Sequence, residues 1–126
     1  RVGDENMFLF GLKTDEVTAL KASGYDPQRY AREDAELGAV LDRISRGFAD
    51  GKSYSDLVSN LLYNGDPYML CADFRDYVNT HDRMYSVISD PAERARLSII
   101  NTAEAGIFAA DRAIKEYAED IWGIKL

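Results

Sequence analysis

Hydrophobic and polar positions recur with the period of an α-helix over most of the chain. The clearest stretch begins near Asp34 and ends at Gly47, with apolar residues spaced by three and four positions. The longest stretch begins at Asp73 and keeps aromatic and aliphatic residues on one stripe as far as Ile88. The pattern predicts helical segments at 14–24, 34–47, 55–63, 73–89, 91–106 and 111–122, and a short turn or helix from Asp26 and Pro27 to Tyr30.

Capping residues support the starts of these segments. Asp90 followed by Pro91 combines a side chain that accepts from helical N–H groups with a proline suited to the first helical position. Asp26 and Pro27 repeat this arrangement. Three further helices are expected to begin at caps supplied by Thr14, by Ser53 or Ser55, and by Asp111.

One segment differs from the helical pattern. The run Met7–Phe10 is apolar, rich in aromatic residues and followed by Gly11, which is typical of a buried strand. The predicted fold class is therefore mainly α, with six or seven helices plus one short strand. A lone strand leaves its backbone groups unpaired. Because the chain also opens on Arg1 without an initiator methionine, we expect 1–126 to be an incomplete part of a larger α/β domain.

The composition of the chain disfavours some classes of binding partner. The length of 126 residues fits at most one domain, and 22 acidic against 15 basic residues give a net charge of −7. This balance disfavours nucleic acid and anionic membranes, which require clustered cations. The hydrophobic content is 46%, but no apolar run is long enough to span a bilayer. A single cysteine, Cys71, cannot form an internal disulfide and indicates a reducing, cytoplasmic setting.

His81 is the only histidine, and acidic residues close to it in sequence raise the question of a metal site. Three or four ligands must converge on a zinc ion. His81 lies four residues after Tyr77 on the apolar stripe, whereas Asp76 lies on another face of the helix. We therefore expect a partly buried structural histidine rather than a metal ligand.

Other candidate groups also favour structural roles. Cys71 lacks a histidine base nearby in sequence and is expected in the core. Gly47 and Gly51 do not form a lysine-bearing phosphate loop. Tyrosines are scattered over the elements rather than gathered as a sugar platform, and Arg112 favours a surface ion pair. The carboxylates expected to be solvated are those of Glu33, Asp34, Glu36, Glu116, Glu119 and Asp120. We predict no catalytic, cofactor-binding or metal-binding residue in this chain.

The order of several short motifs resembles the carboxy-terminal part of the α-1,4-glucan phosphorylases, the glycogen, starch and maltodextrin phosphorylase family. The opening VGDENMFLFG at 2–11 is similar to the family's VGEENxFxFG, and GIFAADRAI at 106–114, continuing to Tyr117 and Trp122, is similar to GxFSSDRxIxxYxxxIW. The motifs between them are GYDP at 24–27, GDPY at 65–68, ADF at 72–74 and NTA at 101–103. Two alanines, Ala109 and Ala110, replace the family's paired serines.

The resemblance implies a two-domain enzyme in which orthophosphate cleaves α-1,4-glucans and releases glucose 1-phosphate with retention. It implies pyridoxal phosphate as cofactor, held by a lysine upstream of this stretch and not bound by these residues. The chain itself would be an inactive scaffold segment of the carboxy-terminal α/β domain, of the GT-B, Rossmann-like type. Its implied partners are the remainder of the phosphorylase chain and, for the whole protein, glucan and phosphate.

Two other hypotheses are distinguishable from this one. A stand-alone acidic helical interaction module would use the stripe from Phe74 to Ile88 as a partner groove and would be stable as a monomer. An enzyme in its own right would release glucose 1-phosphate from glycogen unaided. The scaffold hypothesis instead predicts exposed apolar surface at Phe8, Phe10 and Trp122, and self-association through residues 7–10.

Overall fold

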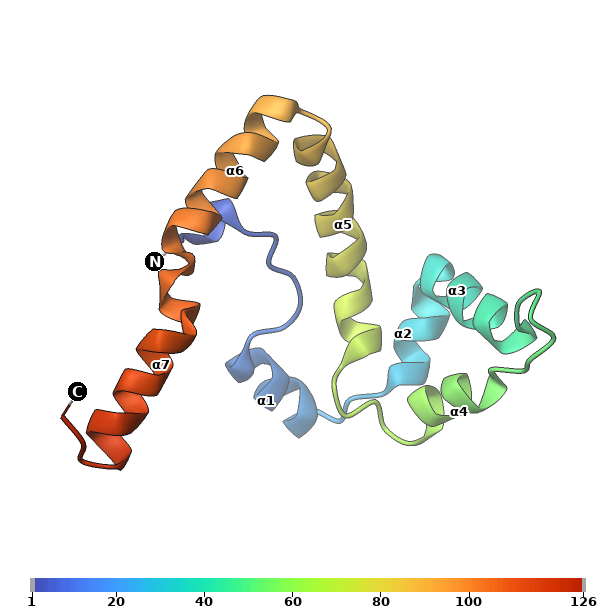
Figure 1. Ribbon diagram of the computed structural model, residues 1–126. Helices are drawn as coiled ribbons and strands as arrows, with labels where there is room; N and C mark the ends of the chain where they lie inside the picture. Colours follow the sequence, from blue (N-terminus) through green and yellow to red (C-terminus); the bar gives the residue numbers. More distant parts are fainter. Residues whose placement is uncertain (1, 126) are drawn as a thin grey trace. The chain divides into compact units, whose positions relative to one another are not determined.

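The computed structural model describes residues 2–125 and is mainly helical, as predicted (Figure 1). A 3-10 turn, η1 (Asp4–Asn6), precedes the helices, and a second, η2 (Ala105–Phe108), joins the last two. The final helix continues as a wider π-type turn, η3 (Tyr117–Ile121). The α-helices are α1 (Thr14–Ala22), α2 (Pro27–Glu33), α3 (Ala35–Arg46), α4 (Ser55–Tyr63), α5 (Leu70–Ile88), α6 (Pro91–Glu104) and α7 (Ala110–Glu116). No helix within residues 2–125 is both long and apolar enough to cross a membrane.

Acidic caps fix three helix starts. The carboxylates of Asp26, Asp34 and Asp90 accept hydrogen bonds from the first-turn N–H groups of α2, α3 and α6. The expected caps at Thr14, Ser55 and Asp111 were wrong, whereas the Ser53 hydroxyl accepts a hydrogen bond from the Ser55 N–H, the first of α4, at 3.4 Å. Thr14, Ser55 and Asp111 lie within the first turns of their helices, and α5 begins three residues before the predicted Asp73. These differences arise because helix ends depend on neighbouring packing as well as on the local residue.

The predicted strand at Met7–Phe10 is absent. Met7 is extended, with φ of −133° and ψ of 160°, but no β-ladder forms anywhere in residues 2–125. A strand needs a second extended segment to exchange backbone hydrogen bonds, and the described part of the chain provides only helices and turns. The prediction of one short strand was therefore wrong for the described residues.

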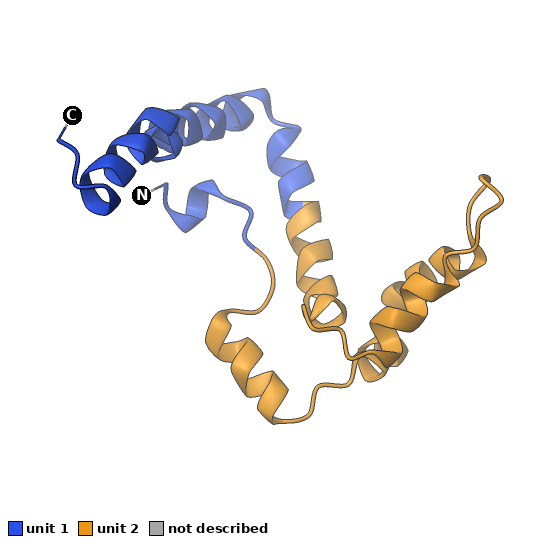
Figure 2. Cartoon of the chain, turned by 60° about the horizontal axis from the view of Figure 1, so that its bottom comes forward, with its two compact units in different colours: residues 1–9, 83–126 blue, residues 10–82 orange. Residues whose placement is uncertain are grey.

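The chain divides into two compact units (Figure 2). One unit, Phe10–Asp82, is built around the buried side chains of Leu37, Leu41 and Cys71. Helices α2, α3 and α4 pack together here, as their amphipathic patterns require. The surrounding half-buried residues are Tyr30, Ala31, Val58, Leu61, Leu62 and Phe74. The core predicted from periodicity thus exists, but it is small.

The other unit contains the described residues up to Leu9 and from Arg83 onward. Its few buried hydrophobic side chains include Leu97 and Ala118. The helical spacing of Ile114, Tyr117, Ala118, Ile121 and Trp122 predicts one inward face, but Trp122 is 62% exposed. Several other predicted core positions are also exposed: Tyr77 and Tyr85 on α5, and Ile114, Tyr117 and Ile121 near the end of the chain. The chain therefore has more amphipathic faces than its own core covers.

The exposure expected from the scaffold hypothesis is largely observed. Phe10 is 52% exposed and Trp122 is among the exposed aromatic residues, whereas Phe8 is half-buried. Exposed apolar surface on a protein often marks a site of contact with another polypeptide. These faces are consistent with a chain that packs against further polypeptide.

Candidate functional site

Asp66 has a fully buried side chain in the turn between α4 and α5. Its backbone has a left-handed φ of 39°, which a non-glycine residue adopts at a cost. The Tyr25 hydroxyl donates to Oδ2 at 2.7 Å, and the Cys71 backbone N–H donates to the same oxygen at 2.8 Å. Oδ1 has no hydrogen-bond partner among the described residues. This carboxylate connects the segment before α2 to the first turn of α5.

The surroundings of Asp66 suppress ionisation of its neighbours. Burial, reinforced by the charge of Asp66, raises the pKa of the Cys71 thiol to about 12. Burial and the hydrogen bond to Asp66 also raise the pKa of Tyr25. A thiol held neutral is a poor nucleophile. Cys71 is therefore a core residue, as expected, and this cluster lacks an activated nucleophile.

Arg75 joins α5 to the start of α3. Its guanidinium lies 2.6 Å from an Asp34 oxygen and 3.0 Å from a Glu36 oxygen. The hydrogen bonds from Arg75, followed by the one from the Leu37 N–H, lower the pKa of Asp34. Asp34 thus stays ionised as a cap and ion-pair partner, which leaves it unsuited to general acid catalysis near neutral pH.

Two acidic residues on α5 hold the segment that precedes α1. Asp76 Oδ2 accepts from the Gly11 N–H at 2.8 Å, and Asp73 Oδ1 accepts from the Leu12 N–H at 2.8 Å. Gly11 has a φ of +87°, and a Cβ placed there would lie 2.7 Å from an Asp73 oxygen. The Phe10 ring meets the Tyr77 ring edge-on, with 5.1 Å between centroids. We call Asp73 and Asp76 the carboxylate clamp.

Asn6 anchors the amino-terminal turn in the other unit. Its side chain, only 8% exposed as a residue, accepts from Arg96 at 2.8 Å and donates to the Val2 carbonyl at 2.8 Å. Asn101 donates to the Asn6 backbone carbonyl at 3.0 Å. These bonds hold η1 against α6.

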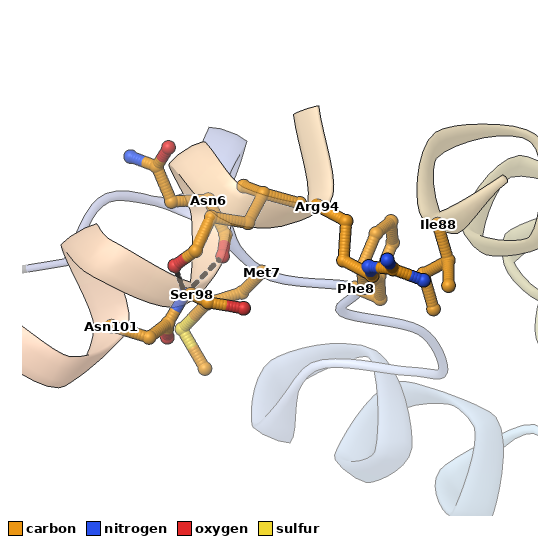
Figure 3. Close-up of a pocket in the computed structure, with 8 residues that line it drawn as sticks. Asn6, Met7, Phe8, Ile88, Arg94, Ser98 and Asn101 are labelled. Carbon is orange, nitrogen blue, oxygen red and sulfur yellow. Dashed lines mark hydrogen bonds between the residues drawn. The ribbon is translucent and has the colours of Figure 1, made fainter. Parts of the chain in front are cut away.

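An open hollow of about 430 Å³ lies beside this anchor (Figure 3). Its walls are mostly apolar, and the polar residues that line it are Asn6, Arg94, Ser98 and Asn101. Its volume is suitable for a small ligand. The residues that line the hollow do not bring an acid, a base and a nucleophile together, so this lining does not form a catalytic site. The apolar side chains that line it are Met7, Phe8, Ile88 and Leu97.

The other residues that the sequence suggested as site candidates belong to none of these clusters. His81 is exposed rather than partly buried, and its ring lies 6.1 Å from that of Tyr77. No group of three or more His, Cys, Asp or Glu residues suited to a metal ion occurs in residues 2–125. Gly47 ends α3, and Arg112 forms an exposed ion pair with Glu116, as expected for a surface pair. Glu33, Glu119 and Asp120 are exposed.

Sequence reasoning missed the buried Asp66, the carboxylate clamp and the anchor at Asn6. The spacing of Asp73 and Asp76 by three residues signals a shared helix face. The turn at Asn64, Gly65 and Asp66 signals a special backbone conformation. No local signal connects Asn6 to Arg96, which lies 90 residues further along the chain.

Comparisons with known proteins give a consistent result. The family model described as carbohydrate phosphorylase matches residues 1–124. A glycogen phosphorylase from Synechocystis is 45% identical over 127 aligned positions, covering 98% of this chain and 15% of that protein. Glycogen phosphorylases from Chlamydia pneumoniae and, in the muscle form, Ovis aries are 35% and 36% identical over 126 positions, with the same coverage. The chain thus spans about 15% of the length of these relatives.

Proposed function

The chain belongs to the carbohydrate phosphorylase family, and we propose that it is a scaffold segment of an α-1,4-glucan phosphorylase. In this proposal the whole protein is a cytoplasmic glycosyltransferase of glycogen breakdown. It uses orthophosphate to cleave α-1,4-glucan and releases glucose 1-phosphate with retention. The observation that carries the proposal is the match of residues 1–124 to the family, with relatives aligned over 98% of the chain.

Pyridoxal phosphate, the cofactor that this family assignment implies, does not fit the residues of this chain. A lysine that forms a Schiff base needs an enclosed site where its amine is desolvated. All the lysines are exposed: Lys13, Lys21, Lys52, Lys115 and Lys125. We propose that the cofactor is bound by other residues of the whole protein and that this segment supports their fold.

The scaffold role explains the uncovered faces. The Phe10–Asp82 unit buries four hydrophobic side chains, those of Leu37, Leu41, Met69 and Cys71, whereas Phe108 and Trp122 are 85% and 62% exposed. Burial of such aromatic residues contributes strongly to interfaces. We propose that these faces, together with the apolar segment Met7–Phe10, pack against the remainder of the phosphorylase chain.

The stand-alone interaction module makes a different prediction. Exposed Tyr77, Tyr85 and Ile88 on α5 are compatible with a partner groove. Family membership along the whole described chain favours the phosphorylase scaffold, since an independent module would not need phosphorylase motifs at both ends. In the whole protein, the exposed face of such a module would also remain accessible to a separate partner.

Phosphorolysis assays test the proposed function. The chain alone, mixed with glycogen and phosphate, is expected to release no glucose 1-phosphate. The whole protein should be active, and deletion of these residues should abolish activity and yield aggregated material. Glucose 1-phosphate formed by the chain alone, or full activity after the deletion, would overturn the scaffold role.

A further inference from the structure

The turn that joins α4 to α5 contains the dipeptide Asn64–Gly65, which is followed by the buried Asp66 (Figure 1). Asn64 and Gly65 are both exposed. Gly65 has a left-handed φ of 91°, and apart from its two chain neighbours no described atom lies within 4 Å of the position that a Cβ would occupy there. A side-chain amide is thus followed directly by an unhindered backbone nitrogen.

The peptide group between Asn64 and Gly65 is free to rotate. Among residues 2–125, neither the Asn64 carbonyl nor the Gly65 N–H takes part in a hydrogen bond. The ψ of Asn64 is 17°, which turns the Gly65 nitrogen toward the backbone nitrogen of Asn64 and away from its side chain. Rotation of the peptide plane changes this ψ and the φ of Gly65 in opposite senses, and glycine adopts either sign of φ. The Gly65 nitrogen can therefore turn toward Asn64 Cγ without the loss of a hydrogen bond from this peptide group.

We propose that Asn64 is a site of spontaneous deamidation in the folded chain, with water as the co-reactant. The Gly65 nitrogen loses its proton and forms a bond to Asn64 Cγ, and the bond between Cγ and Nδ2 breaks as ammonia leaves. Water then opens the resulting cyclic imide at either of its carbonyl carbons. One product is aspartate with the ordinary backbone, and the other is isoaspartate, in which the main chain passes through the side-chain carbons.

The comparable dipeptide Asp50–Gly51 lacks this free peptide group. The Gly51 N–H donates to the Phe48 carbonyl at 3.4 Å, and the Asp50 carboxylate accepts from the Lys52 N–H and from the Tyr54 hydroxyl. The hydrogen bond from Tyr54, followed by the one from the Lys52 N–H, lowers the pKa of Asp50. The other asparagines all precede residues larger than glycine and are Asn6, Asn60, Asn79 and Asn101. Since an ionised carboxylate resists attack by a nucleophile, cyclisation at Asp50 should be slow.

Deamidation would weaken the junction that Asp66 holds. A carboxylate at position 64 lies at the carboxy-terminal end of α4, where the helix dipole disfavours negative charge. Isoaspartate also lengthens the main chain close to Asp66, whose φ is 39° and whose carboxylate accepts from Tyr25 and from the Cys71 N–H. We therefore expect both products to be less stable than the parent chain, isoaspartate more so. This inference concerns the chain itself and does not rest on the proposed phosphorylase function.

Incubation of the folded 126-residue chain at mildly alkaline pH, followed by digestion and mass spectrometry, tests the site. The peptide that contains residue 64 should become heavier by the difference between water and ammonia. Gly65→Ala should slow this conversion at least tenfold, whereas the matched control Gly51→Ala, at a φ of 71°, should leave its rate unchanged. Asn64→Gln, which would need a larger ring, should remain unmodified. An unmodified Asn64 in the folded chain, under conditions that convert a peptide of residues 60–68, would overturn the proposal.

Two further measurements test the restraint on Asn64 and the effect on Asp66. The Asn64 amide donates to Asn60 Oδ1 at 2.6 Å, so Asn60→Ala should release the side chain and raise the rate of conversion at least twofold. A rate that stays the same or falls would contradict this restraint. The purified isoaspartate product should unfold at a lower urea concentration than Asn64→Asp, which adds the charge alone. An isoaspartate product as stable as the parent chain would contradict the link to Asp66.

Discussion

Asp76 and Gly11 are 65 positions apart in sequence, yet the Gly11 N–H donates to Asp76 Oδ2 at 2.8 Å. The adjacent Leu12 N–H donates to Asp73 one helical turn away on α5. Two consecutive amides in the segment that precedes α1 are thus fixed by one face of a helix. Hydrogen bonds to charged acceptors are stronger than those between neutral groups. This clamp and the contact of the Phe10 ring with Tyr77 together hold the segment against α5.

Gly11→Ala should destabilise the chain. Alanine at a φ of +87° costs about 1–2 kcal/mol, and its Cβ would also displace an Asp73 oxygen that lies 2.7 Å from the Cβ position. Gly51→Ala is the matched control, because Gly51 has a φ of +71° but no atom within 4 Å of the position that a Cβ would occupy. Urea denaturation followed by circular dichroism should show a larger loss for Gly11→Ala. Equal losses would mean that the close approach to Asp73 has no energetic role.

Asp66→Ala should lower the free energy of unfolding by about 1–3 kcal/mol, because it leaves the Tyr25 hydroxyl and the Cys71 N–H without their acceptor. Tyr25→Phe should cost less, about 1 kcal/mol, since it removes one partner of the same bond. The double variant should lose less than the sum of the two single losses. Strict additivity in denaturation experiments would show that Tyr25 and Asp66 act independently.

Stability should fall in alkaline solution. The folded-state pKa of Cys71 is about 12, whereas an unfolded thiol has a pKa of about 8.5. Between these values the unfolded chain binds fewer protons than the folded chain, so stability is lost as the pH rises through this window. The raised pKa of Tyr25 acts in the same direction above about pH 10.

Cys71→Ala isolates the thiol contribution. Unfolding free energies measured from neutral to alkaline pH should fall less steeply for the variant than for the parent chain. At neutral pH the thiol is protonated in both states, so any difference there reports packing alone. Parallel pH profiles would exclude a role for Cys71. In the folded chain the same thiol should also resist alkylation and react after denaturation.

Asp34→Ala should cost about 1–2 kcal/mol, because it removes the cap of α3 as well as the ion pair with Arg75. The stabilisation that follows from the lowered pKa of Asp34 is present above its unfolded value of about 3.9 and is lost as the pH falls through the folded pKa. The free energy of unfolding should therefore fall less steeply with decreasing pH in Asp34→Ala than in the parent chain. Asp42→Ala, which removes an exposed helix ion pair, is the control and should have a much smaller effect.

Helix identity was predictable from sequence because its signals are local. The spacing of Leu37 and Leu41 identified the α3 face that is buried, and Asp26, Asp34 and Asp90 cap the helices that follow them. The motifs at both ends of the chain resembled the phosphorylase family, to which the comparisons assign it.

Tertiary structure alone decided which polar residues hold the fold and which hydrophobic faces remain open. The contacts of Asp66 with Tyr25, and of Asn6 with Asn101, join residues 41 and 95 positions apart. Periodicity cannot anticipate such pairs, because it describes faces of one element and not the partner that each face meets. For the same reason it places Trp122 on an inward face and Met7–Phe10 in a strand. A buried face and a β-ladder both require a second surface, and the described chain supplies neither at those positions.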